Sequence, residues 1–298
     1  ITINKEKGKK FNVADYCDLN RVGTKNNIDI YYSKTYSLKN KEDILHINSL
    51  KIDIVFVLGW QRIIPKIILD NLTIGAFGMH GSSMDLPLGR GRSPMNWSII
   101  EGRKYFKTSL FRYDSGIDSG EVLDTIKFDI TNRDTSETLH FKNTLSMNYL
   151  IDKNLENLLS DNFKLRKQKN IIPTYYPKRN PSDSLIDWEL DVYDIERFTR
   201  AVTKPFNGAF TFLNNKVTIF NSQVFDSFYF GFENKSLGEI VAVFPNGKFL
   251  VKCNGGLLLV KKYLAVNGDI KVGSIFNNSN QEVKKFPKNK FGNYDLEK

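Results

Sequence analysis

Cysteine and histidine are both scarce in this chain. Its 298 residues include two cysteines, Cys17 and Cys253, which lie far apart and belong to no paired motif. A disulfide between them is one possibility, but two reduced cysteines in a reducing compartment are the simpler interpretation. We therefore predict a cytoplasmic protein. The three histidines, His46, His80 and His140, lack the spacing of a metal cluster, and we therefore predict no metal site.

Long hydrophobic runs are also lacking. No apolar run approaches the ~18 residues of a membrane-spanning helix, and no segment resembles a signal peptide, so we predict no membrane association. Hydrophobic residues make up 41% of the chain and aromatic residues 13%, which is ample for ordinary cores. The length favours roughly two domains of about 100–200 residues each.

Negative charge is in deficit, with a formal net charge of +10 and a pI near 9.3. Such a balance admits a polyanionic partner, for example RNA or a nucleotide-linked substrate. However, the basic residues are spread along a sequence that is rich in Lys, Asn and Ile throughout. Charge alone therefore does not establish nucleic-acid binding.

The N-terminal half contains two apolar runs typical of buried strands. Residues 52–58 form a continuous β-branched run, which predicts a strand covered on both faces in a parallel sheet. A second such strand is predicted over residues 72–79, with His80 directly after it. Ligands in open α/β sheets bind beyond the carboxyl ends of the strands, so this pattern places His80 at a candidate site.

Further along, two predicted strands over residues 106–113 and 121–129 are joined by a loop that contains Asp118. Residues 134–137 have the pattern of a capping box, which opens a long amphipathic helix. A histidine and a carboxylate that meet at strand ends can transfer protons. The alternative is a structural histidine and an ordinary turn aspartate, since Asp is common between glycines.

The composition changes near residue 161 and becomes polar and proline-punctuated. We predict a first domain over residues 1–172, a linker over 173–190 and a C-terminal domain over 191–298 whose tail frays after residue 277. Within the C-terminal domain, five short β-rich segments with Asn-Gly turns fit a small barrel of the OB type.

Four motifs together carry a family resemblance: His80-Gly-Ser-Ser, Leu86-Pro87, Arg90-Gly91-Arg92-Ser-Pro94 and Gly116-Ile-Asp118-Ser-Gly120. They resemble the signature of the formyltransferases that use 10-formyltetrahydrofolate, which include the methionyl-tRNA and sugar N-formyltransferases. The resemblance implies a Rossmann-like, mostly parallel α/β domain followed by an OB-like β-barrel. It also implies that His80 acts as base or oxyanion donor and that Asp118 orients the imidazole.

The chain departs from this signature at two places. Gly78 stands where the family has an asparagine whose amide contributes to the oxyanion site, and Asn96, Ser82, Ser83 or a backbone N–H are the candidate substitutes. An inactive relative is the alternative. In addition, the family's first strand and helix have no counterpart, so we expect either that about 30 residues precede this sequence or that its sheet opens differently.

Binding roles follow from the same resemblance. Residues 59–65 align with the loop that cradles the pterin ring, which implies cofactor contacts by Trp60, Ile63, Ile64, Pro65 and, from the later turn, Gly116. Without the resemblance, the apolar members of this set would simply be core residues.

Ser82, Ser83, Arg90 and Arg92 are the candidate substrate contacts. The guanidinium groups of the two arginines match phosphate oxygens, although surface solubility explains them equally well.

The acceptor is predicted from a difference between branches of the family. The tRNA enzymes carry a longer insertion where this chain has only the basic loop of residues 5–10. We therefore favour transfer to the amino group of a nucleotide-linked amino deoxysugar, a precursor of surface polysaccharide such as lipopolysaccharide. A methionyl-tRNA formyltransferase and a non-catalytic binding protein stay open as alternatives, as does a homodimer.

Overall fold

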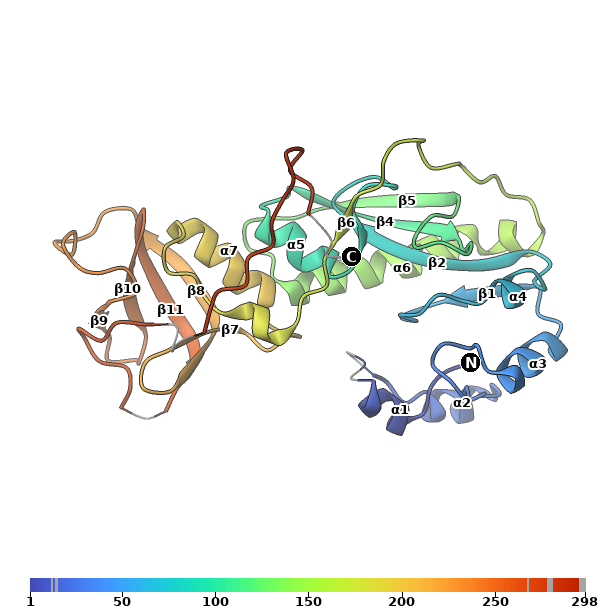
Figure 1. The fold of residues 1–298 in the computed structure, drawn as a ribbon, viewed down its shortest axis with the longest axis horizontal. Coiled ribbons are helices and arrows are strands. Elements are labelled where there is room, and N and C mark those ends of the chain that lie inside the picture. The colour runs from blue at the N-terminus through green and yellow to red at the C-terminus, as the bar shows by residue number, and fades with distance from the viewer. Residues whose placement is uncertain (12, 14–15, 267, 278–280, 295–298) are drawn as a thin grey trace. The chain divides into compact units, whose positions relative to one another are not determined.

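The computed structural model describes residues 1–11, 13, 16–266, 268–277 and 281–294, and the chain divides into two compact units (Figure 1). The first unit contains Ile1–His80, Ser109–Asp124 and Asp152–Gln168. The second contains Gly81–Thr108, Thr125–Ile151 and Lys169–Lys298. The domain boundaries predicted at residues 172 and 190 remain predictions.

A four-stranded sheet forms the centre of the N-terminal half. Its strands β1 (Ile54–Val57), β2 (Gly75–Ser82), β4 (Tyr105–Arg112) and β5 (Val122–Asp129) lie in the order β1-β2-β4-β5. Strands β1 and β2 pair in parallel, with Ile54 opposite Gly75. This pairing confirms the prediction of a mixed α/β fold with parallel strands, because both strands come from the apolar runs identified in the sequence.

The first unit also holds the helices α1 (Lys5–Lys10), α2 (Asn20–Asn26), α3 (Lys41–Ser49) and α4 (Lys66–Leu69), besides the end of the long helix α6. Asn40 caps α3 by accepting a hydrogen bond from the backbone N–H of Glu42 at 2.8 Å. Ile47 of α3 and Ile68 of α4 pack with Val57 of β1 in one apolar cluster. Burial of these side chains ties the two helices to the strand that precedes the site.

The second unit contains α5 (Pro94–Ile100), most of the long helix α6 (Ser136–Leu159) and α7 (Val192–Val202). It also contains the 3-10 helix Pro181–Ser184 and the short strands β3 (Arg90–Gly91) and β6 (Tyr175–Tyr176), which pair in parallel.

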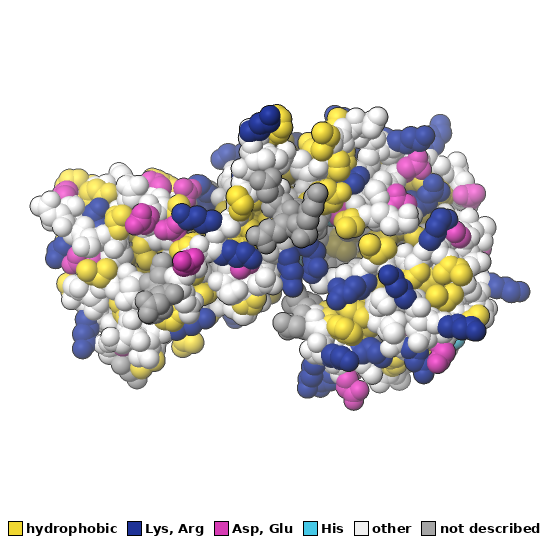
Figure 2. Space-filling model, in the orientation of Figure 1, with side chains coloured by type: hydrophobic (Ala, Val, Ile, Leu, Met, Phe, Trp, Pro, Cys, Tyr) yellow, Lys and Arg dark blue, Asp and Glu magenta, His cyan; other side chains and the backbone are white. Residues whose placement is uncertain are grey.

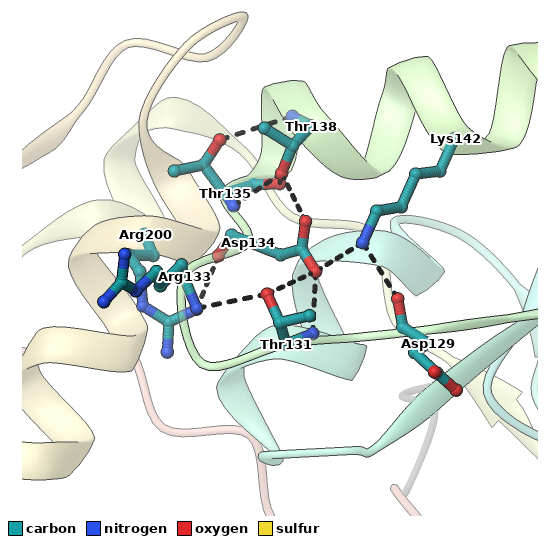
Figure 3. Close-up of polar contacts among 8 residues, drawn as sticks. All are labelled: Asp129, Thr131, Arg133, Asp134, Thr135, Thr138, Lys142 and Arg200. Carbon is teal, nitrogen blue, oxygen red and sulfur yellow. Dashed lines mark hydrogen bonds and ion pairs between the residues drawn. The ribbon is translucent and has the colours of Figure 1, made fainter.

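The start of α6 differs in detail from the sequence prediction (Figure 3). Thr135 and Thr138 cap the helix reciprocally: the N–H of each donates to the hydroxyl oxygen of the other, at 2.9 Å and 3.3 Å. The box therefore spans residues 135–138, one residue later than predicted, because Asp134 is engaged elsewhere. Its carboxylate accepts hydrogen bonds from Thr131, Thr138 and Lys142.

A five-stranded antiparallel sheet follows α7. It comprises β7 (Ala209–Phe212), β8 (Lys216–Asp226), β9 (Ile240–Val243), β10 (Phe249–Cys253) and β11 (Gly256–Leu264), in the order β7-β8-β11-β10-β9. Isolated bridges join Phe212 to Asn277 and Glu239 to Ile275. The segment 275–277 therefore contacts both edges of the sheet, at the end of β7 and just before β9. The antiparallel sheet agrees with the prediction. Among the described residues the edge strands β7 and β9 do not pair with each other, so the sheet is not closed and the OB-type barrel stays a prediction.

Part of the C-terminal tail is packed, in contrast to the fraying expected from its composition. Phe286 lies edge-on to Trp97, with ring centroids 4.8 Å apart. Lys288 and Tyr294 bond to the Glu101 carboxylate at 2.7 Å and 3.0 Å. The remainder of the predicted tail includes residues 278–280 and 295–298, which lie outside the described residues.

The surface agrees with the charge distribution inferred from the sequence. Figure 2 shows Lys and Arg side chains dispersed over the face in view, so positive charge is not confined to one element. In the part of the chain that the structure describes, no helix is both long and apolar enough to cross a bilayer. Nor do the described residues bring three or more His, Cys, Asp or Glu side chains together in a metal-binding group.

Candidate active site

Strand β2 presents His80 near its carboxyl end. Side chains alternate between the two faces of a strand, so Gly78 and His80 occupy the same face about 7 Å apart along it. His80 is buried, with 7% of its surface exposed. The sequence placed this histidine directly after the strand, and the structure includes it within the last three residues of β2.

His80 and Asp118 meet in the first unit. The Nδ1 atom of His80 lies 3.3 Å from Oδ2 of Asp118, and their side chains are 8% and 20% exposed. A carboxylate on one ring nitrogen fixes the orientation of the imidazole and favours a proton on that nitrogen. The pair predicted from the sequence is therefore close in space, which is the geometric requirement for proton transfer.

The loop that carries Asp118 is held at several points. Asp118 has a φ of +48°, a left-handed conformation that is uncommon outside glycine. Asp114 accepts a hydrogen bond from the N–H of Gly116 at 2.9 Å. Gln168 donates from Nε2 to the carbonyl oxygens of Asp118, at 2.7 Å, and of Gly120, at 2.8 Å. These bonds stabilise the conformation that aims the carboxylate at His80.

Gly120 is needed in this loop for steric reasons. A Cβ atom at residue 120 would overlap the carbonyl oxygen of Arg112, which is backbone and cannot rotate away. The glycine after Asp118 therefore lets the loop return close to the end of β4.

Gln168 and Tyr113 were not among the residues predicted from the sequence. Gln168 lies in a polar segment with no motif, so its role depends on the fold alone. Tyr113 follows the last residue of β4 and donates its backbone N–H to the carbonyl of Ala76 at 2.7 Å. Its side chain covers Gly78: a Cβ at residue 78 would overlap Cε2 of the Tyr113 ring and lie 3.0 Å from its hydroxyl oxygen.

The segment 59–65 combines core and exposed positions. Ile64 is buried in the cluster that contains Val57 and Ile68, whereas Ile63 is 50% exposed. Trp60 packs edge-on against Tyr36, with ring centroids 4.9 Å apart.

Among the described residues, the buried indole N–H of Trp60 has no hydrogen-bond partner. Pro65 directly precedes α4, and Gly116 is exposed in the loop before Asp118. Of this predicted set, Trp60 and Ile63 thus offer groups that a ligand could engage.

The remaining predicted residues lie in the second unit. Arg90 is largely buried and donates from Nη1 to the Tyr175 hydroxyl at 3.4 Å, whereas Arg92 is exposed. The hydroxyl of Ser82 accepts from the N–H of Met84 at 3.2 Å.

Two further members of that set make buried hydrogen bonds. The hydroxyl of Ser83 pairs with that of Tyr176 at 3.3 Å. The Asn96 amide donates to the carbonyl of Ala201 at 2.6 Å, which favours a structural role over the catalytic role expected from the sequence.

Two family models match this chain in succession. Residues 10–147 match the formyl transferase model, and residues 178–280 match the model of the formyl transferase C-terminal domain. The methionyl-tRNA formyltransferase of Rickettsia felis is 30% identical over 259 residues, which is 87% of this chain and 80% of that protein. The chain belongs to the formyl transferase family. The resemblance inferred from the His80 and Asp118 motifs is thereby confirmed.

Two other proteins are also similar to this chain. The bifunctional polymyxin resistance protein ArnA of Wigglesworthia glossinidia brevipalpis is 33% identical over 215 residues, so the match spans 72% of this chain but only 32% of ArnA. The N-formyltransferase of Helicobacter canadensis, solved in complex with folinic acid and dTDP-3-aminofucose, superposes with a TM-score of 0.59 at 20% identity. That match covers 83% of each chain and shows the shared fold.

Proposed function

We propose that this protein transfers the formyl group of 10-formyltetrahydrofolate to the amino group of a nucleotide-linked amino deoxysugar. The observation that carries the proposal is the pairing of His80 with Asp118 at 3.3 Å, in a chain that belongs to the formyl transferase family. Acyl transfer to an amine needs a group that accepts the nitrogen proton, and an imidazole held by a carboxylate supplies one.

Each residue of the pair has a distinct part in this chemistry. His80 takes the proton that the acceptor nitrogen loses as its bond to the formyl carbon forms, and it returns a proton to the departing nitrogen. Asp118 stabilises the imidazolium between these two transfers. Gln168 acts on neither substrate but keeps the Asp118 backbone in place through two hydrogen bonds.

The residues of the 59–65 segment fit a folate donor, whose contribution when bound is an activated formyl group. Trp60 offers an indole N–H that has no partner within the described part of the chain, and Ile63 offers an exposed apolar side chain. Trp60 would donate to a polar edge of the pterin, and Ile63 would cover its face. Ile64 belongs to the core, and we do not assign it a contact.

The choice of acceptor is supported by two independent observations. The Helicobacter canadensis enzyme, which shares the fold, was solved with a dTDP-linked aminosugar. The segment over residues 5–10 is a single short helix, α1, instead of a long insertion. Arg92 is exposed and its guanidinium group matches phosphate oxygens, and we propose it as a contact of the nucleotide.

A methionyl-tRNA acceptor is the second candidate, favoured by the 30% identity to the Rickettsia felis enzyme over most of both chains. The two candidates share the proton-transfer chemistry of His80 and Asp118. The two candidate functions differ in the acceptor molecule, most of which binds outside the site. An experiment can therefore distinguish them only by identifying the acceptor.

The test is an acceptor screen read by mass spectrometry. The protein, extended to any upstream coding sequence, is offered 10-formyltetrahydrofolate with a panel of UDP-, dTDP- and GDP-linked amino sugars, and with initiator methionyl-tRNA in parallel. Gain of the formyl mass on one sugar, lost in His80→Ala, supports the proposal. Formylation of the tRNA alone would replace the acceptor and keep the mechanism, whereas silence on both substrates would favour a binding protein.

A further inference from the structure

Tyr113 occupies the space in front of Gly78 on β2. Because a Cβ at residue 78 would overlap Cε2 of the Tyr113 ring, glycine is the residue that admits this ring. The hydroxyl oxygen lies 3.0 Å from that Cβ position, where a polar side chain of residue 78 would begin. The phenol therefore stands on the face of β2 that also carries His80, whose position is about 7 Å further along the strand.

Two contacts fix the position of the Tyr113 ring, one made by its backbone and one by the ring itself. Its backbone N–H bonds to the carbonyl of Ala76 at 2.7 Å, which anchors it to β2. Its ring stacks on Phe111, with centroids 5.1 Å apart and planes 17° apart. Phe111 is itself 1% exposed, so it offers a fixed support. A donor that is held before the reaction needs no reorganisation when charge develops.

The Tyr113 hydroxyl makes no hydrogen bond within the described residues, so its O–H is free to donate to a ligand. Tyr113 is also one of the residues that line an open groove of about 330 Å³, together with Lys66, Leu72 and Arg112. Burial, and after it the negative charge of Asp118, raise the pKa of Tyr113 to about 12. The phenol is therefore protonated at neutral pH and can donate.

Two of the other polar side chains near the signature are already engaged: Asn96 donates to a backbone carbonyl and Ser83 pairs with Tyr176. Ser82 accepts from the N–H of Met84 and keeps its own O–H. Tyr113 differs from Ser82 in that its ring fills the space in front of Gly78, the position of the family's amide.

We propose that the hydroxyl of Tyr113 donates a hydrogen bond to the oxyanion that develops on the formyl oxygen during transfer. This role rests on the proposed function. The lone pair of the acceptor amine forms the new N–C bond while the C=O π pair moves onto oxygen, where Tyr113 stabilises it. As that pair returns, the bond from carbon to the folate nitrogen breaks with its electrons on nitrogen, and His80 relays the amine proton to that nitrogen.

The test replaces Tyr113 by phenylalanine, which keeps the ring and removes only the donor. We expect kcat to fall by ~10²-fold or more, as is usual for loss of one oxyanion donor, while KM for both substrates changes by less than about threefold. Thermal unfolding should stay unchanged, since the hydroxyl bonds to no described residue. Tyr105→Phe, at the exposed start of the same strand β4, is the matched control and should retain wild-type kcat.

A rescue experiment separates donation from packing. Tyr113→Ala removes both ring and donor, and adding Gly78→Asn to it places an amide in the vacated space. We expect the double variant to recover kcat at least about tenfold over Tyr113→Ala, whereas Gly78→Asn alone should lose activity because the ring blocks the new side chain.

The outcomes are distinguishable. Near wild-type kcat in Tyr113→Phe, or no recovery in the double variant, would overturn the role of Tyr113 while leaving formyl transfer standing. A wild-type enzyme that formylates no acceptor would instead overturn the proposed function, and the Tyr113 role with it.

Discussion

Asp118 adopts a backbone conformation that most residues avoid, and the loop around it supplies what maintains that conformation. A φ of +48° in a non-glycine residue costs of order 1 kcal/mol or more and persists only where the surroundings determine it. Here the surroundings are the two hydrogen bonds from Gln168 and the close approach of Gly120 to Arg112. The strain coincides with the carboxylate that orients His80, which is typical of functional sites.

The direct test of the pair is substitution of each member. His80→Ala and Asp118→Asn should each lower kcat by on the order of 10²-fold or more, because general acid–base groups contribute that much. Circular dichroism and thermal unfolding should show that both variants fold. His46→Ala, outside the site, serves as the control, and turnover near the wild-type rate in either site variant would refute the assigned roles.

Gln168 acts through Asp118, so its replacement tests positioning. Gln168→Ala leaves two carbonyl oxygens without this donor and frees the loop, and we expect kcat to fall by roughly tenfold, since small displacements of reacting groups are costly. Gln168→Glu should be at least as harmful, because a carboxylate cannot donate to a carbonyl. If both variants kept the wild-type kcat with only a lower melting temperature, Gln168 would be purely structural.

At the scale of elements, the start of α6 depends on one buried carboxylate (Figure 3). Burial opposes ionisation of Asp134, but hydrogen bonds from Lys142, Thr131 and Thr138 outweigh it and lower the pKa of this carboxyl below its usual value. The carboxylate thereby joins the preceding turn to the first two turns of the helix. The backbone carbonyl of Asp134 also accepts from Arg200 of α7 at 2.5 Å.

Asp134→Asn should lower the free energy of unfolding by about 2–3 kcal/mol at pH 7, because it leaves a partly buried ammonium without its carboxylate. The pKa of Asp134 is lowered on folding, so its stabilisation is complete above about pH 4 and is lost as the pH falls through the folded pKa. Urea unfolding of both proteins at pH 7 and near pH 2 would measure this. The difference should shrink at the lower pH, and Asp152→Asn, exposed on the same helix, should show none at either.

For the whole molecule, the excess of positive charge affects association more than folding. A net charge of +10 attracts anions, and the range of this attraction is the Debye length. Salt shortens the Debye length from about 30 Å at 0.01 M to about 3 Å at 1 M. Because the Lys and Arg side chains are dispersed over the face seen in Figure 2 and along the sequence, we expect this attraction to be general and not directed along one stripe.

We therefore expect kcat/KM for an anionic nucleotide sugar to fall by roughly tenfold between these two salt concentrations while kcat changes by less than about twofold. Steady-state kinetics across the salt range would measure both constants. The free amino sugar without its nucleotide is the control and should show a flat kcat/KM. An equally steep decline for this acceptor, which carries no phosphate, would show that salt acts on the protein and not on the encounter.

The sequence by itself predicted the two buried strands of the parallel pair and the proximity of His80 to Asp118. Apolar runs predicted β1 and β2, because a strand buried on both faces has to be continuously hydrophobic. The motifs around His80 and Asp118 predicted that the two residues meet, and they lie 3.3 Å apart. These features are local in the chain or belong to a specific signature, so they could be identified without coordinates.

Only the tertiary structure decided which other side chains lie around His80 and Asp118. Asn96, chosen for its chemistry, donates to a carbonyl 105 residues away, and no sequence pattern reveals that partner. Gln168 reaches a loop 50 residues earlier, and Tyr113 fills the space in front of Gly78 because β4 ends beside β2. The availability of a hydrogen-bonding group depends on every neighbour that folding brings to it, and those neighbours are distant in the sequence.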